Sequence, residues 1–463
     1  MKKFLQWFII ACMAGIIGGG CNSYDSDFVY KSEKALKAME DISEVAHEEF
    51  LRGSYNDAEA RLRSLITERT VSRPLYQLEL ISVLLMNGKK EEAHELMMRL
   101  HEDLELLFDA ESEEKAQSIW HGEINKVYKG DSYERATFYA LMALSFIQQE
   151  NYEDALRAIK NGLLADADSN SEDAINDYAL LHYLGYFAAQ KLNYEAEAQE
   201  YLQAMFGAMG NRNFNGHENN CFSQLQKNNA NTLLVVWVGE APTVACTGEY
   251  EENRTIICGR LPFTAMSLAV NASSAFMVAN NLGDLDYQAT TRGGRLMDNV
   301  LANKAAVKKG MEVTSNIFFI AGTGLIIAGG ACINSSPTVG ICLLGAGGSC
   351  YICGLGIYFI GYMMNPAADG RYWRNIPGQL YIIPLNLPQG EHKIALTGYH
   401  NSDRVALSIF DVNISDDTKM NIIHLPMMQQ SADIWQATQD KLQEEITNAE
   451  QKAGVSRFDK ELK

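Results

Sequence analysis

Asn151-Tyr152-Glu153-Asp154-Ala155 is the clearest copy of a short phrase that lies between alanine- and leucine-rich stretches in the first half of the chain. The other copies are Gly53-Ser54-Tyr55-Asn56-Asp57-Ala58, Gly88-Lys89-Lys90-Glu91-Glu92-Ala93 and the degenerate Asn193-Tyr194-Glu195-Ala196-Glu197-Ala198. The residues at the start of each copy are small or polar and favour a turn, whereas the flanking stretches have the composition of helices. We therefore interpret each copy as the turn between two paired helices, and residues 28–210 as a helical repeat domain.

Two kinds of side chain in the phrase are expected to carry the packing. The tyrosines that pack back over the first helix of a pair are Tyr55, Tyr152 and Tyr194. The alanines that let the second helix approach closely are Ala58, Ala93 and Ala155. Ala58 and Ala93 are 35 residues apart, and the domain resembles the tetratricopeptide family, whose period is about 34 residues. This resemblance implies a concave face that binds protein partners; a plain helical bundle is the alternative.

An apolar segment from 313 to 368 contains no charged residue. It holds two apolar runs, Ile317–Ile333 and Val339–Met364, separated by the turn-forming Asn334-Ser335-Ser336-Pro337. The second run is long enough to span a bilayer and the first nearly so. Neither run alternates polar with apolar residues, so we expect a helical hairpin instead of strands.

Small residues four apart, Gly324 with Ala328 and Ala346 with Cys350, are candidates for close contact between the hairpin helices. Ile326 and Leu344 lie near the middle of the runs, where a membrane would be most apolar. Three interpretations stay open. The hairpin inserts into a membrane within a homo-oligomer, it is a core element buried by the rest of the protein, or it is a surface for self-association only.

The first residues have the order of a secretory signal: basic Lys2 and Lys3, apolar Phe4–Ile17, and Gly18-Gly19-Gly20 running into Cys21. We expect residues 1–20 to be removed and Cys21 to be acylated, with 21–27 as a lipidated linker. Gly18 departs from the Leu, Val or Ile preferred three residues before the cysteine, so an ordinary signal or an uncleaved anchor is the alternative. Asn22 favours a lipid anchor (palmitate or a similar acyl chain) in the outer membrane, facing the periplasm.

The remaining segments are expected to contain strands. Residues 211–312 are a mixed β/α segment, with a buried strand at Leu233–Val238 and an amphipathic helix at Thr290–Gly310 that fits either a membrane surface or a solvated face. Residues 369–430 carry short apolar runs that indicate a small antiparallel β-sandwich, and 431–463 form a polar helical or disordered tail. The predicted fold class is therefore α+β and multidomain.

Cysteine spacing suggests specific pairings. In an oxidising compartment Cys246–Cys258 is the closest plausible disulfide in the β region, with Cys221 nearby. Cys332 and Cys342 flank the hairpin turn and are close enough for a clamp. Cys350 and Cys353 have C-x-x-C spacing, but small-residue packing is favoured over redox chemistry because no charged neighbour lowers a thiol pKa.

Charge and motifs exclude several functions. The net charge is −19, and removing Lys2 and Lys3 leaves 37 basic against 58 acidic residues, or −21. Such a chain does not bind nucleic acid, because phosphate contacts need clustered Lys and Arg. The usual nucleophile-elbow, Walker, metalloprotease and dinucleotide motifs are absent from the sequence, and the scattered histidines lack metal-ligand spacing. We therefore expect no enzyme activity, no cofactor and no metal.

Two further stretches resemble an uncharacterised family of Gram-negative lipoproteins that contain tetratricopeptide repeats. They are Tyr128-Lys129-Gly130-Asp131-Ser132-Tyr133-Glu134-Arg135 and Ala368-Asp369-Gly370-Arg371-Tyr372-Trp373-Arg374-Asn375-Ile376-Pro377, the latter followed by Pro388-Gln389-Gly390-Glu391-His392. The resemblance covers most of the mature chain, implies a role in envelope or peptidoglycan biogenesis, and brings no assigned activity. The long Gly- and Cys-rich hairpin departs from typical members.

Together these features predict an envelope lipoprotein that binds protein partners through its repeats, while the acylated Cys21 and the hairpin hold it to the membrane. The alternative is a subunit of an oligomeric membrane pore or export channel built from several hairpins.

Overall fold

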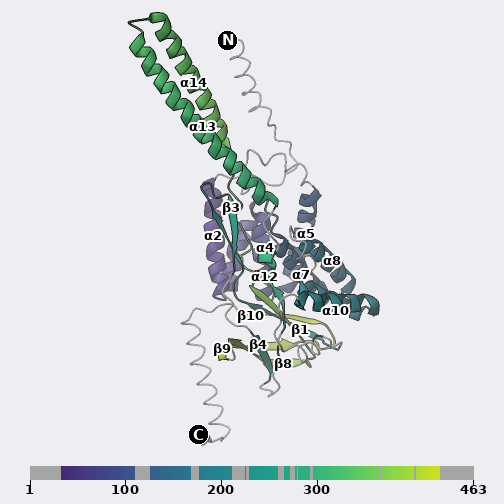
Figure 1. The fold of residues 1–463 in the computed structure, drawn as a ribbon. Helices are drawn as coiled ribbons and strands as arrows, with labels where there is room; N and C mark the ends of the chain where they lie inside the picture. Colours follow the sequence, from purple (N-terminus) through teal and green to yellow (C-terminus); the bar gives the residue numbers. More distant parts are fainter. Residues whose placement is uncertain are drawn as a thin grey trace, which may run out of the picture.

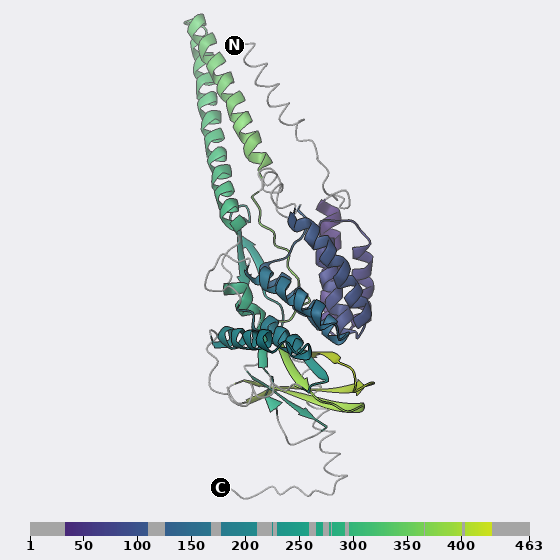
Figure 2. The ribbon, with the colours of Figure 1, turned by 90° about the vertical axis from the view of Figure 1, so that its right-hand side faces the viewer.

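The computed structural model describes residues 33–109, 126–167, 177–210, 225, 229–258, 265–271, 277–278, 280–291, 296–364, 366–400 and 403–427. Within these ranges the chain is a mixed α and β structure with a body of helices and sheets, from which one long pair of helices projects (Figures 1 and 2). The predicted signal 1–20, the acylation site Cys21, the linker 21–27, Cys221 and the tail 431–463 lie outside the described residues.

The helical unit, residues 33–210, consists in its described part of four helix pairs. They are α2 (Glu33–Leu51) with α3 (Tyr55–Ile66), α4 (Arg73–Met86) with α5 (Lys90–Asp109), α7 (Ser132–Gln148) with α8 (Tyr152–Ala167), and α9 (Ala179–Lys191) with α10 (Glu195–Gly210). The first helix of the later pairs is almost wholly buried, whereas the second buries a single stripe: α9 buries all residues from Ala179 to Ala189, but α8 buries only six. The first helices therefore face the protein interior and the second helices face outward.

The turns inside the four pairs share one geometry. In each turn a residue with positive φ lies two positions before the first residue of the second helix. These residues are Gly53, Gly88, Glu150 and Asn193, with φ between 58° and 78°. Five residues after each of these comes an alanine, and its backbone N–H donates to the carbonyl four residues earlier at 2.9–3.1 Å. These alanines, Ala58, Ala93, Ala155 and Ala198, are all 0% exposed. A small side chain that is fully buried at this position lets the two helices of each pair pack closely.

The β unit consists of two four-stranded sheets and a separate hairpin. The first sheet has the order β10 (Asn421–Met427), β1 (Thr232–Val238), β7 (Gln379–Leu385), β6 (Asn280–Asp284). The second has the order β5 (Met277–Val278), β4 (Ala265–Val270), β8 (Gly390–His400), β9 (Asp403–Ile414). The hairpin pairs β2 (Thr243–Thr247) with β3 (Asn253–Ile257).

The first sheet lies between the helical unit and the second sheet. Alternate residues of a strand point to opposite faces, so Leu233, Val235 and Trp237 of β1 join the core shared with the helices. Leu234 and Val236 instead join a second core with β4, β8 and β9. Burial on both faces explains why β1 reads as an uninterrupted apolar run.

The β elements differ from the sequence-based expectation in two ways. Strands from the 211–312 segment pair with strands from 369–430, and the β1–β10 pair is parallel where an antiparallel sandwich was expected. The expected Cys246–Cys258 disulfide is also wrong, because Cys246 pairs with Arg254 across the hairpin and both thiols are free. The four strand positions that separate Arg254 from Cys258 span about 13 Å.

The projecting elements are α13 (Leu296–Cys332) and α14 (Pro337–Met363), preceded by the short α12 (Leu285–Thr291). The basic segment before the apolar run, expected as a separate amphipathic helix over 290–310, is instead mostly the first part of the 37-residue α13. The Cys332 and Cys342 thiols are free, so the expected clamp across the turn is not formed.

Candidate functional site

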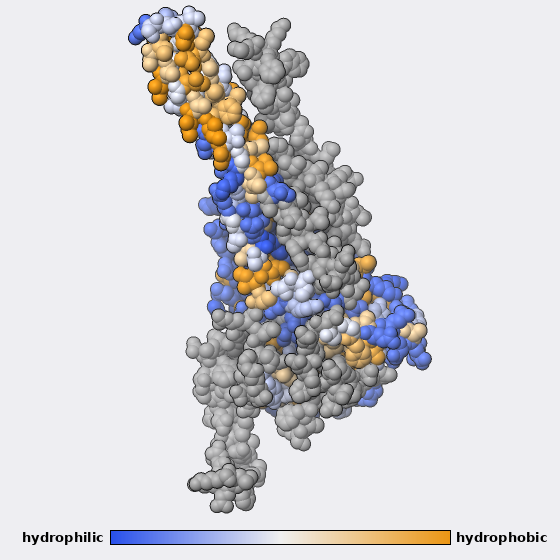
Figure 3. All heavy atoms as spheres, viewed as in Figure 1, coloured by the Kyte–Doolittle hydropathy of each residue, from blue (hydrophilic) through white to orange (hydrophobic). Residues whose placement is uncertain are grey.

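Helices α13 and α14 together are called the helix pair below. Its outer part exposes apolar side chains to the surroundings (Figure 3, orange). Ile320, Ile327 and Ile341 are 73%, 67% and 62% exposed. Residues 303–332 and 337–363 are long and apolar enough, by length and composition, to cross a membrane. In water this surface would carry a large hydrophobic cost, and soluble monomers rarely expose a continuous apolar patch of such extent.

Glycines spaced seven residues apart form the contact between α13 and α14. Gly340, Gly347, Gly354 and Gly361 are the buried residues of α14. They face a matching row on α13 in which Ser315, Gly322 and Gly329 are buried. A Cβ at Gly347 would lie 2.8 Å from the Gly322 carbonyl oxygen, and one at Gly329 would lie 2.9 Å from that of Gly340. The two backbones thus touch directly, a mode of packing common between helices in lipid.

The predicted small-residue pairs do not make this contact. Gly324 has open space where a side chain would be, and Ala328 and Ala346 are exposed on the outer surface. Cys350 is half-buried. Ile326 and Leu344 do lie at the contact, because Ile326 packs over Gly347 and Leu344 packs over Gly329. A four-residue spacing failed here because an extended antiparallel contact follows the seven-residue period of two helical turns.

Hydroxyl groups of the helix pair are hydrogen-bonded within it. Thr314, Thr323 and Ser349 each donate to the carbonyl four residues earlier, at 2.7–2.9 Å. The Thr323 and Tyr351 hydroxyls also meet at 2.6 Å across the pair. Polar groups that satisfy one another in this way can enter a hydrocarbon environment at low cost.

Charged and aromatic residues surround the base of the helix pair, where it joins the body. Lys308 Nζ donates to the Met364 carbonyl at 3.0 Å and lies 4.6 Å from the Tyr250 ring centroid. The Tyr250 hydroxyl donates to Glu312 at 2.7 Å, and Lys309 pairs with Glu249 at 2.6 Å. The β2–β3 hairpin, which carries Tyr250, therefore fixes the pair to the body.

The repeat residues named from the sequence fall into two groups. Ala58, Ala93 and Ala155 are fully buried at the turns, and Tyr55 and Tyr152 are partly buried against the core. Tyr194 is 45% exposed. The positive-φ residues explain this difference: Asn193 matches Glu150, so Tyr194 occupies the place of Asn151 and not that of Tyr152. The fourth copy was therefore aligned one residue out of step.

The inner side of the helical unit is covered by the protein's own chain. Helices α4 and α7 contact β10, and α9 contacts β6. The connecting segment, residues 366–378 between α14 and β7, runs along α2, α4 and α7. Its Trp373 is 0% exposed, donates from Nε1 to Ser82 Oγ at 3.1 Å, and donates from its backbone N–H to Glu134 Oε1 at 2.6 Å. Sequence reasoning missed this because no local pattern predicts which surface a connecting segment will cover.

Two buried ion pairs hold the connecting segment in place. Arg371 pairs with Asp369 at 2.8 Å and donates to the Lys126 carbonyl at 2.9 Å. Arg254 of β3 pairs with Asp131 at 2.5 Å and donates to the Asp369 carbonyl at 3.0 Å. The two stretches that carry the family resemblance, around 128–135 and 368–377, therefore meet in space.

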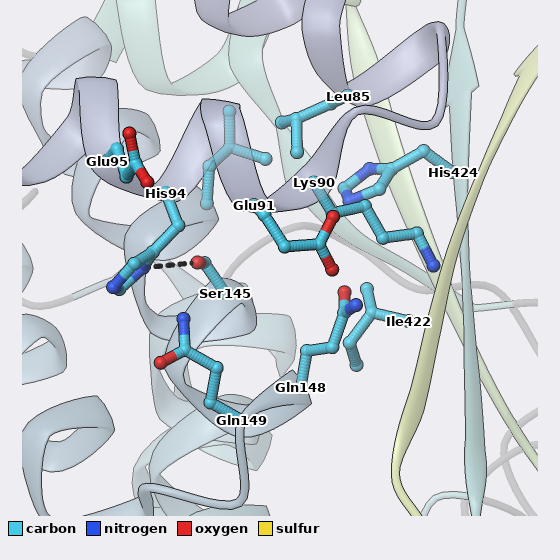
Figure 4. A pocket seen from close by; sticks show the side chains of 11 residues that line it. Leu85, Lys90, Glu91, His94, Glu95, Ser145, Gln148, Gln149, Ile422 and His424 are labelled. Carbon is cyan, nitrogen blue, oxygen red and sulfur yellow. Dashed lines mark hydrogen bonds between the residues drawn. The ribbon is translucent and has the colours of Figure 1, made fainter. Parts of the chain in front are cut away.

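A cavity of about 240 Å³ lies where α5 and α7 meet β10 (Figure 4). His424 lines it and accepts a hydrogen bond at Nδ1 from the Trp237 indole at 3.0 Å. Burial lowers the pKa of His424 to about 3, so the ring is neutral with its proton on Nε2. Lys90 and Glu91 place charges of both signs in the same cavity, which favours no single class of ligand.

Comparisons with known proteins add no assignment: no family model matches the chain, and no curated protein is significantly similar to it.

Proposed function

We propose that this protein is a membrane-inserted scaffold of the bacterial cell envelope. The exposed, charge-free outer part of the helix pair, residues 313–363, carries the proposal. Its apolar surface is unfavourable in water and is accommodated by the hydrocarbon of a bilayer. Acylation at Cys21 would add a second anchor beside the helix pair.

We further propose that the helical unit consists of tetratricopeptide-type repeats and binds protein partners by its outward helices. The shared turn geometry and the buried alanines support the repeat type. Because the connecting segment and the first sheet occupy the inner side, the outward faces of α3, α5, α8 and α10 are the surfaces left for a partner. In this proposal the body is a rigid platform at the membrane surface, with a role in envelope biogenesis.

The test uses a Cys21→Ala chain expressed without residues 1–20, so that neither acyl chains nor the apolar Phe4–Ile17 can hide the contribution of the helix pair. Ile320→Arg places a charge on the exposed face of α13 without touching the glycine contact. A charge at mid-bilayer costs about 2.5–3.5 kcal/mol on insertion scales. We expect the Cys21→Ala protein to float with liposomes after a carbonate wash, and the added Ile320→Arg change to reduce the floated fraction.

Val307→Arg is the matched control, since Val307 is also exposed (48%) on α13 but precedes the charge-free stretch. It should leave flotation unchanged. If the Cys21→Ala protein stays folded and does not float at all, the membrane proposal is wrong.

A subunit of an oligomeric pore is the second candidate. The observation in its favour is that Gly324, Ala328 and Ala346 point outward, where small residues would let neighbouring copies approach closely. Size-exclusion chromatography with light scattering in detergent separates the two: a closed ring of defined mass supports the pore, and a monomer supports the scaffold.

A further inference from the structure

We propose that the helix pair crosses the whole bilayer and presents residues 333–336 to the compartment on the far side, so that the protein contacts both faces of one membrane. This inference rests on the membrane insertion proposed above and adds its depth. A shallow insertion, with the turn inside the hydrocarbon, is the competing arrangement.

The length of the apolar part matches a full crossing. On α13 the charge-free part runs from Val313 to Cys332, or 20 residues. At 1.5 Å per residue this is about 30 Å, the thickness of the hydrocarbon core. On α14 the 22 residues from Pro337 to Tyr358 reach about 33 Å by the same rise.

The base of the helix pair has the composition of the near interface. Lys308, Lys309 and Glu312 lie on α13 just before the charge-free part, and Tyr358 and Tyr362 stack on α14 at 6.4 Å between ring centroids. Both tyrosines are exposed, at 49% and 73%. Tyrosine and lysine gather at the level of lipid headgroups. In Figure 3 the change from orange to blue along the helix pair marks the same boundary.

The turn between the two helices is polar, so a shallow insertion would place polar groups in the hydrocarbon of the bilayer. Asn334, Ser335 and Ser336 follow one another between the helices, and the Ser335 and Ser336 side chains are exposed. In hydrocarbon, each unsatisfied backbone or side-chain polar group of the turn would cost several kcal/mol. Fixing the base at the near headgroups and adding about 30 Å of helix puts the turn at the far headgroups. There these groups meet water.

The middle of the helix pair fits the bilayer centre. Thr323 is the eleventh of the 20 residues on α13, and its hydroxyl is joined to Tyr351 at 2.6 Å. The Tyr351 hydroxyl thus has its partner at the depth where no water is available.

Single-cysteine labelling tests the depth. The cysteines other than Cys21 are replaced by serine or alanine, and circular dichroism checks the fold. One cysteine is then placed at the turn (Ser335→Cys), in the middle (Ala346→Cys) or on the body (Glu153→Cys). The purified full-length mature chain is reconstituted into liposomes and treated with a membrane-impermeant maleimide.

For molecules whose body faces outward, we expect Glu153→Cys to react at once and Ser335→Cys to react only when the reagent is admitted to the lumen. Ala346→Cys should react with neither treatment until detergent is added. If Ser335→Cys stays unreactive in both compartments, the turn is inside the hydrocarbon and the crossing is refuted, while insertion stands. If all three positions react from outside, the membrane proposal itself fails.

Discussion

At the residue scale, two buried glutamates in the helical unit differ in the hydrogen bonds that their carboxyl groups accept. Glu79 of α4 accepts a hydrogen bond from the Ser43 hydroxyl at 2.5 Å and one from the backbone N–H of Arg374. Glu134 of α7 accepts three, from the Tyr128 hydroxyl and the backbone N–H groups of Asp131 and Trp373, at 2.6–2.7 Å. Burial raises the pKa of both carboxyls to about 7, and Asp131 adds to the rise at Glu134.

Glu79→Gln should change how stability depends on pH. The Glu79 carboxyl has a pKa near 4.5 when unfolded and about 7 when folded. The folded state therefore binds the extra proton, and the stability from Glu79 is full below pH 4.5 and lost as the pH rises through 7. Between pH 5 and pH 8 we expect the free energy of unfolding of the variant to rise relative to that of the wild type by about 2–3 kcal/mol. Urea unfolding at both pH values measures this, and an equal difference at both would contradict it.

Glu134→Gln should destabilise the protein at both pH values. An amide has one oxygen and one NH₂ group, whereas both Glu134 oxygens face donors, so the NH₂ group would meet an N–H or O–H. Leaving a buried donor without its acceptor costs about 1–3 kcal/mol. The same urea titration measures the loss. Should Glu134→Gln instead behave like Glu79→Gln, the three donors do not set the role of this carboxylate.

At the scale of elements, the glycine contact between α13 and α14 yields a prediction with an internal control. Gly347→Leu brings a side chain within 2.8 Å of the Gly322 carbonyl oxygen, and backbone cannot move aside without separating the helices. Gly345→Leu, two residues away, points into open space. We expect Gly347→Leu to lose at least about 1–3 kcal/mol, and Gly345→Leu to lose nothing, in SDS titrations followed by circular dichroism. Equal behaviour of the two variants would place the contact elsewhere.

The register of the turn between α9 and α10 gives a second prediction at this scale. Ala198 is 0% exposed at the place of Ala155, whereas Tyr194 is exposed. Ala198→Leu should therefore cost about 1–3 kcal/mol by overpacking, and Tyr194→Ala should stay within about 0.5 kcal/mol of the wild type. Urea unfolding of the two variants side by side is the measurement. A large loss in Tyr194→Ala would restore the original alignment.

At the scale of the whole molecule, sequence patterns predicted elements better than their partners. The strand Gln379–Leu385 and the buried run Leu233–Val238 could be located because apolar runs and turn residues are local signals. The pairing of Leu233–Val238 with Asn421–Met427 joins residues some 190 positions apart, and no local signal encodes that. The seven-residue row of glycines on α14 is visible in the sequence, but a four-residue spacing of small residues does not select it. The burial of Trp373 under α4 and α7 depends on the assembled fold and could not be read from its neighbours.

The shared core leads to a last prediction, that the helical unit and the β unit unfold together. One hydrophobic core joins helices α2 to α10 with Leu233, Val235 and Trp237 of β1, and with Trp373 of the connecting segment. The β unit has a second core between its two sheets, but removing either unit would expose the apolar surface that the other buries in the shared core. A fragment of residues 28–210 should therefore be poorly soluble or molten.

Two probes report the two units in the intact chain. Circular dichroism at 222 nm follows mainly the helices, and tryptophan fluorescence follows Trp237 and Trp373 once Trp7, Trp120 and Trp435 are replaced by phenylalanine. In urea, with detergent present, we expect the fluorescence transition to coincide with the main loss of helical signal, as two-state unfolding requires. A helical signal that survives in the helix pair would appear as a sloping baseline at high urea. Two separated transitions, with fluorescence lost before the bulk of the helical signal, would show that the β unit folds apart from the helical unit.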